Sequence, residues 1–88
     1  MPAYRVVTTR AALQDLAALP KQVLARTDAR ILALADTPRP PGVTILHGSE
    51  RLLRVRVGDY RIVYQVDDNN RTVTVARVRH RRQVYRRL

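Results

Sequence analysis

The stretch LRVRVGDYRIVY, residues 53–64, constrains the fold more than any other part of this chain. Apolar and basic residues alternate on both sides of Gly58-Asp59, and such alternation is typical of a β-strand with one buried face. A pair with glycine first suits the two-residue type II′ turn that joins antiparallel strands. The pattern therefore predicts a β-hairpin with strands over residues 52–57 and 60–66.

This hairpin would gather arginines on one side of a sheet. A two-residue turn places Arg56 opposite Arg61 and Arg54 opposite Val63, so the three arginines share one face. The apolar residues share the other face, which we expect to point toward helices: Val55, Val57, Tyr60, Ile62 and Tyr64. Like charges directly opposite one another destabilise a strand pair by some tenths of a kcal/mol. The arginine face is therefore either a solvated surface with splayed side chains or a surface that binds an anion.

Periodicity and turn residues predict the other elements. Residues 4–7 form a short strand, Thr8 or Thr9 caps a first helix, and Pro20 lies in the first turn of a second helix that ends before Pro38. Residues 72–78 form the last strand, and residues 82–88 a short final helix. The order β-α-α-β-β-β predicts an α+β fold, a largely antiparallel sheet covered by a helical hairpin. With 88 residues and no internal repeat, we expect a single domain over residues 1–88.

Charge and cysteine content limit the partners and the compartment. Seventeen basic residues against seven acidic ones give a net charge of +10, and sixteen of the bases are arginine. Guanidinium groups suit bidentate contacts with phosphate, so the composition points to nucleic acid or an acidic protein. The chain has no cysteine, which fits a reducing compartment. It also has no apolar run suited to a signal peptide or a membrane span, so we predict a cytoplasmic protein without membrane contact.

The C-terminal sequence VRHRRQVYRRL supplies a second motif. Together, GDYRIVY and the downstream HRRQVY resemble the RelE-type toxins of the bacterial RelE/ParE toxin–antitoxin superfamily, and the similarity covers nearly the whole chain. The resemblance implies an mRNA endoribonuclease that acts on the ribosome and inhibits translation. By motif, the family's catalytic set falls on Arg54, Arg56, Arg61, Arg81 and Tyr85. Arg54 would chiefly bind RNA, as would the other C-terminal arginines Arg77, Arg79, Arg82, Arg86 and Arg87.

The residue types fit such a reaction. In RNA cleavage the ribose 2′-OH attacks the adjacent phosphorus, and fixed guanidinium groups stabilise the extra negative charge of the phosphorane. Some family members carry lysine where this chain has Arg54 and Arg56, and an arginine is a poor proton acceptor. Tyr85 would stack on a base or assist proton transfer, or it would only pack the last turn. His80 is either an acid or base or a polar residue at a strand end. No metal or cofactor is predicted.

The resemblance also implies partners. We expect an acidic antitoxin that forms an inhibitory complex and also binds operator DNA, with the ribosome and mRNA as targets. The toxin would be a monomer or weak dimer on its own. Two other functions stay open: inhibition of DNA gyrase, as in ParE-like toxins, and a catalytically silent module that binds only antitoxin and operator.

Overall fold

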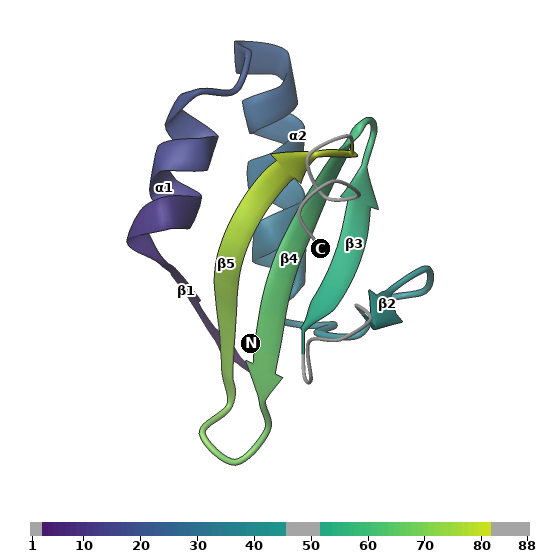
Figure 1. The fold of residues 1–88 in the computed structure, drawn as a ribbon. Helices are drawn as coiled ribbons and strands as arrows, with labels where there is room; N and C mark the ends of the chain where they lie inside the picture. Colours follow the sequence, from purple (N-terminus) through teal and green to yellow (C-terminus); the bar gives the residue numbers. More distant parts are fainter. Residues whose placement is uncertain (1–2, 46–51, 82–88) are drawn as a thin grey trace.

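A computed structural model of the chain describes residues 3–45 and 52–81. Two helices lie across one face of a single sheet whose strand order is β1-β5-β4-β3-β2 (Figure 1). The strands are β1 Arg5–Thr8, β2 Thr44–Ile45, β3 Leu53–Val57, β4 Tyr60–Asp67 and β5 Thr72–His80, and the helices are α1 Arg10–Ala17 and α2 Lys21–Ala33. All neighbouring strands are antiparallel except β1 and β5. The predicted α+β fold is confirmed.

The sequence analysis missed one strand. β2 spans only two residues, Thr44 and Ile45, and pairs with Arg54 and Leu53 of β3. Two residues are too few to show alternation, so no periodicity could have predicted this strand. The ends of β4 and β5 also extend one and two residues beyond their predicted positions. The short helix predicted over residues 82–88 lies outside the described residues.

Local sequence signals fix both helix starts. Thr9 caps α1: its hydroxyl oxygen accepts a hydrogen bond from the Ala12 N–H at 3.1 Å and donates one to the Ala76 carbonyl at 2.8 Å. The same side chain therefore starts the helix and ties it to β5. Pro20 stands at the N-cap of α2, one position before the helix rather than inside its first turn. Neither described helix is long and apolar enough to cross a bilayer.

The core lies between the helices and the sheet and is mainly aliphatic. Ala12 and Leu16 of α1 and Ile31 of α2 pack against the inward residues of β3, β4 and β5. Tyr64, at the centre, is fully buried and donates a hydrogen bond to the Pro38 carbonyl at 2.7 Å. Burial raises the pKa of Tyr64 to about 12. This one side chain anchors the proline-rich connector to the middle of the sheet.

The predicted hairpin register is confirmed at every pair, including Arg56 opposite Arg61 and Arg54 opposite Val63. Gly58 has φ +57°, the conformation that the first position of a type II′ turn requires. We expect Gly58→Ala to lower the free energy of unfolding by about 1–2 kcal/mol, because a Cβ is strained at this φ. A Cβ there meets only Arg26 Nη2 at 3.6 Å, an ordinary contact, so the loss reflects backbone strain alone.

A matched control is available at Gly42, in the connector. Its φ is +88°, and a Cβ built there has no atom within 4 Å. Gly42→Ala should therefore cost a similar amount in thermal or urea unfolding, while leaving the hairpin unchanged. A Gly58→Ala variant as stable as the original chain would show that the turn adopts another conformation in solution.

Candidate anion-binding site

The hairpin turn and a bulge in β5 together build the site. From Tyr60 to Val63, β4 pairs with residues 77–80 of β5, but Tyr64 pairs with Val75, so Ala76 is one extra residue in β5. A strand alternates faces at every residue, and an inserted residue reverses the faces beyond it. Val73 and Val75 point into the core before the bulge, and Val78 points into the core after it. Arg77 and Arg79 are thereby turned to the outer face.

The outer face now carries a row of three arginines across three neighbouring strands. Arg56 of β3 is opposite Arg61 of β4, and Arg61 is opposite Arg79 of β5. Opposed residues in such a ladder have Cα atoms about 4.5–5.5 Å apart. We call Arg56, Arg61 and Arg79 the arginine row. It lies at the end of the sheet that carries the β3–β4 turn (Figure 1).

Burial within the row argues against the first of the two interpretations of this face, a solvated surface with splayed side chains. Arg61 retains only 7% of its surface exposed, on a strand that has a neighbouring strand on either side. Its Nη1 donates to the carbonyl of Tyr60 at 3.2 Å. The Nε of Arg79 is buried and has no hydrogen-bond partner within the described residues. Arg56 is exposed and its Nε donates to the Gly58 carbonyl at 3.1 Å.

These features favour anion binding over simple solubility. A cation that has lost its water is costly unless a counter-charge or hydrogen bonds replace the water. Arg61 and Arg79 are partly desolvated side by side, and the Arg79 Nε has no acceptor among residues 3–45 and 52–81. A phosphate group would supply both the charge and the acceptors. The arrangement therefore suits a phosphate of a nucleic acid strand.

The structure brings Arg81 close to the row but turns His80 away from it. The backbone N–H of Arg81 donates to the carbonyl of Asp59 at 2.7 Å, which places this exposed residue beside the turn. His80 is paired with Tyr60, and alternation puts both on the opposite side of the sheet from Arg61 and Arg79. The two rings contact edge to face with centroids 5.2 Å apart.

Two other predicted RNA-binding residues differ in their surroundings. Arg77 reaches over the edge of the sheet to Asp15 of α1, and its Nε and Nη2 donate to the carboxylate at 2.8 and 3.1 Å. Arg54 is opposite Val63, one row away from Arg61 on the same face, and is half-buried. Tyr85, Arg82, Arg86 and Arg87 lie outside the described residues. Arg77 is thus part of the structural framework rather than of the arginine row.

Asp15 also accepts a hydrogen bond from the backbone N–H of Val78 at 2.9 Å. Partial burial by itself would raise the pKa of Asp15, but the hydrogen bonds from Arg77 and Val78 and the charges of Arg77 and Arg79 outweigh it. The pKa of this carboxyl is consequently held below its ordinary value. This contact joins residues 62 positions apart and was not predicted from the sequence.

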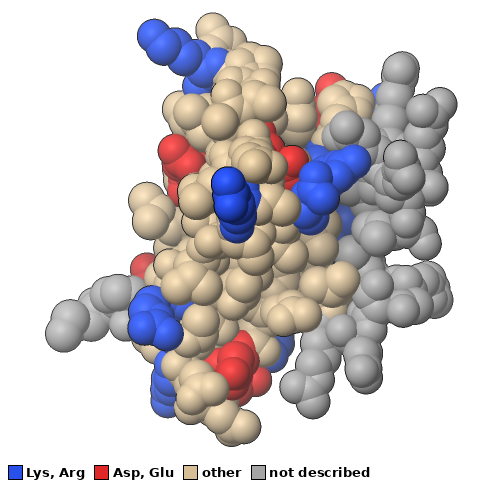
Figure 2. Space-filling view, turned by 60° about the vertical axis from the view of Figure 1, so that its left-hand side comes forward, with Lys and Arg blue, Asp and Glu red and all other residues tan. Residues whose placement is uncertain are grey.

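Charge is mixed on the side of the molecule that α1 covers. There, acidic and basic groups are interspersed among uncharged surface (Figure 2). This face therefore carries no single continuous basic patch among the described residues. Within the described residues, no group of three or more His, Asp or Glu side chains is placed to hold a metal ion.

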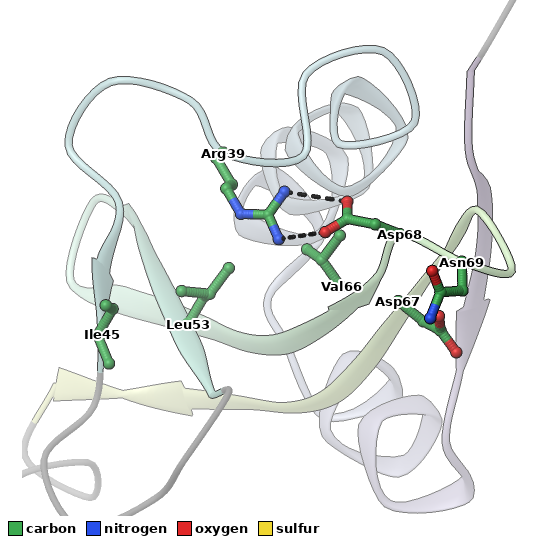
Figure 3. A pocket seen from close by; sticks show the side chains of 7 residues that line it. All are labelled: Arg39, Ile45, Leu53, Val66, Asp67, Asp68 and Asn69. Carbon is green, nitrogen blue, oxygen red and sulfur yellow. Dashed lines mark hydrogen bonds and ion pairs between the residues drawn. The ribbon is translucent and has the colours of Figure 1, made fainter.

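A hollow of about 440 Å³ at the other end of β4 is a second candidate (Figure 3). Its apolar side chains are Ile45, Leu53 and Val66, and Asp67, Asp68 and Asn69 line it as well. Arg39, the basic residue there, forms two hydrogen bonds with the Asp68 carboxylate, at 3.0 and 3.2 Å. With its cation already paired and two carboxylates present, this hollow does not suit a phosphate.

Comparison with known proteins shows which family this fold belongs to. Residues 6–85 match the family described as the ParE toxin of type II toxin–antitoxin system, parDE. Toxin RelG of Mycobacterium tuberculosis is 36% identical over 87 residues, which cover 96% of this chain and 98% of RelG. Toxin RelE of the same organism is 32% identical and covers 94% of this chain and 87% of RelE.

Solved structures give the same result. The archaeal RelE–RelB complex from Pyrococcus horikoshii matches with a TM-score of 0.79 and 28% identity over 90% of this chain and 96% of that one. The toxin–antitoxin complex RelBE2 from Mycobacterium tuberculosis matches with a TM-score of 0.78 and 32% identity over 91% of this chain and 99% of that one.

Proposed function

This chain belongs to the RelE/ParE superfamily of toxins from type II toxin–antitoxin systems, and we propose that it stops translation by cleaving mRNA on the ribosome. The observation that carries the proposal is the arginine row, in which Arg61 is held almost fully buried between two other arginines. Preorganised cations of this kind stabilise charge that develops during a reaction, because they need no reorganisation when the charge appears.

The chemistry follows from the row. The ribose 2′-oxygen forms a bond to phosphorus and the bond from phosphorus to the 5′-oxygen breaks, leaving a cyclic phosphate and a 5′-hydroxyl. Arg61 and Arg79 contact the non-bridging oxygens, whose negative charge increases in the phosphorane. Arg56 and Arg81 bind the same phosphate from the two sides of the turn. Because guanidinium groups supply charge and not proton transfer, most of the catalysis is electrostatic and positional.

Proton transfer has fewer candidates. Within the described residues His80 lies on the opposite side of the sheet from the row, so we do not assign it as acid or base. Asp59 lies in the turn and accepts through its backbone. Tyr85 therefore remains our candidate for stacking on a base or assisting proton transfer. A site with so little acid–base chemistry needs RNA delivered in a reactive conformation, which explains dependence on the ribosome.

Two assays test this function. Primer extension on a message translated in vitro should show cleavage within codons when the toxin is added and none without ribosomes. A DNA gyrase supercoiling assay with the same preparation should show no inhibition. The matching family carries the name ParE, so the second assay addresses the function in which such toxins poison gyrase. Inhibition of supercoiling without mRNA cleavage would overturn the proposal.

Our proposal for how the toxin is regulated is based on its relatives, several of which were solved in complex with an antitoxin. We propose that an acidic antitoxin, partly disordered when alone, holds this chain inactive in the cytoplasm, and that the complex also binds operator DNA. The free toxin would be a monomer or weak dimer. A disordered acidic segment can wrap a large basic surface at the cost of its own ordering entropy.

We expect the antitoxin to cover Arg56, Arg61 and Arg81 or to displace the segment that carries Tyr85. Hydrogen exchange on the toxin, alone and in complex, would then show slower exchange in β3, β4 and the C-terminal residues. Slower exchange confined to α1 would contradict this, since inhibition would then act away from the site.

A further inference from the structure

Arg26 of α2 lies at the hairpin turn, on the other side from Arg56. Its Nη2 comes within 3.6 Å of the position that a Cβ on Gly58 would occupy. On the other side, the Nε of Arg56 donates a hydrogen bond to the carbonyl of the same glycine at 3.1 Å. Two guanidinium groups from different elements therefore lie around one two-residue turn. Arg26 was not among the predicted site residues.

Arg26 has no evident structural role. It is exposed, whereas the buried positions of α2 are Thr27 and Ile31. Across residues 3–45 and 52–81 it makes no hydrogen bond and no ion pair, so all five of its N–H donors are available to a ligand. A glycine at position 58 also leaves the space beside its guanidinium open.

Resting on the proposed function, we infer that Arg26 is a further RNA-binding residue. It extends the phosphate-binding surface from the arginine row, over the Gly58–Asp59 turn, onto α2. The RNA strand on which the row acts would continue across this turn, with a neighbouring phosphate on Arg26. Tyr60 and His80, paired on the helix-facing side at the same end of the sheet, offer aromatic surface along that path. Arg26 would thus contribute affinity rather than catalysis.

Arg30 is the matched control. It is also an exposed arginine of α2, one turn further along the helix. Burial raises the pKa of Tyr64, and the charge of Arg30 partly opposes that rise, so Arg30 lies nearer to the buried Tyr64 side chain than to the turn. Replacing either arginine with glutamine removes one positive charge from the same exposed helix. A non-specific effect of net charge would therefore be equal in the two variants.

The test measures binding of a 2′-O-methylated single-stranded RNA oligonucleotide by fluorescence anisotropy over a range of salt concentrations. Each phosphate contact on a single strand contributes a slope of about 0.7 to the dependence of log K on log salt, which corresponds to about fivefold in affinity at 0.1 M salt. We expect Arg26→Gln to lose about this slope and affinity, Arg26→Lys to retain both, and Arg30→Gln to change affinity by less than twofold.

Equal losses in Arg26→Gln and Arg30→Gln would overturn the inference, as would no loss in Arg26→Gln or no RNA binding by the unmodified chain. Cleavage on ribosomes serves as the separate readout. At subsaturating toxin, Arg26→Gln should cleave mRNA about fivefold more slowly, in line with its lower affinity, whereas Arg30→Gln should cleave at the unchanged rate. If the anisotropy result holds but no variant cleaves mRNA, the proposed function fails and the RNA-binding role of Arg26 stands.

Discussion

Replacing Arg61 with methionine is expected to lower the rate of mRNA cleavage by about 10²–10³-fold without unfolding the protein. The rate falls because one preorganised donor to the developing charge is lost, and single donors of that kind are worth this much in other enzymes. Methionine retains most of the apolar stem that fills the nearly closed space around Arg61. A single-turnover cleavage assay on programmed ribosomes would measure the rate.

Stability separates this expectation from a structural effect. Arg61→Met removes the hydrogen bond to the Tyr60 carbonyl but also relieves repulsion with Arg56 and Arg79, so we expect a change of no more than about 1 kcal/mol. Alanine is a poorer choice, because a residue with 7% exposure leaves a hole when it is truncated. The matched control is Arg54→Met, one row away on the same face of the sheet but on β3. Unfolding of Arg61→Met, or equal loss of cleavage in both variants, would contradict the assignment.

The hairpin could be predicted from the sequence because its information is local. Alternation, a Gly-first turn and the two-residue loop together determine which residues are opposite, and each predicted pair is present. The burial of Arg61 could not be predicted in this way. Burial depends on what surrounds a side chain in the folded chain, and no pattern within residues 53–64 contains even the cross-strand neighbour Arg79 on β5.

The bulge in β5 left a signal that the sequence analysis did not use. Buried valines recur at spacing two, Val73 and Val75, and then at spacing three, Val78. A change from two to three within a strand indicates an extra residue that reverses the faces. That shift makes Arg79 the cross-strand neighbour of Arg61, whereas motif matching had selected Arg81 as catalytic and Arg79 only as RNA-binding. Both arginines are now candidates for the reacting phosphate.

Long-range polar contacts were beyond prediction for a different reason. An Asp in an amphipathic helix and an Arg in a strand have many potential partners, and sequence spacing does not select among them. Among the residues that the structure describes, two Arg–Asp pairs have two hydrogen bonds each, Arg77 with Asp15 and Arg39 with Asp68. Their settings differ: the Asp15 side chain is 15% exposed and that of Asp68 is 56% exposed.

We therefore expect Asp15→Ala to destabilise the protein far more than Asp68→Ala. Truncating Asp15 leaves the N–H of Val78 and the guanidinium of Arg77 without their acceptor in a partly buried setting, which should cost about 2–3 kcal/mol. For a domain of this size the melting temperature would fall by about 10–20 °C. Asp68→Ala should change it little, because exposed ion pairs are weak. Equal melting temperatures for the two variants would refute this.

The pH dependence of unfolding distinguishes charge from packing at Asp15. The pKa of Asp15 is lowered in the folded state, so the ionised carboxylate stabilises the folded state more than the protonated carboxyl does. The stabilisation is fully present above the unfolded-state pKa of about 3.9 and is lost as the pH falls through the lower, folded-state value. The gap in stability between the original chain and Asp15→Asn should therefore be constant near neutral pH and shrink in acid. Because Asp15 holds the strand segment next to Arg79, the same acid range should loosen the arginine row before the core unfolds. A gap that stays constant down to the lowest pH at which the protein folds would mean that Asp15 acts through shape and not through charge.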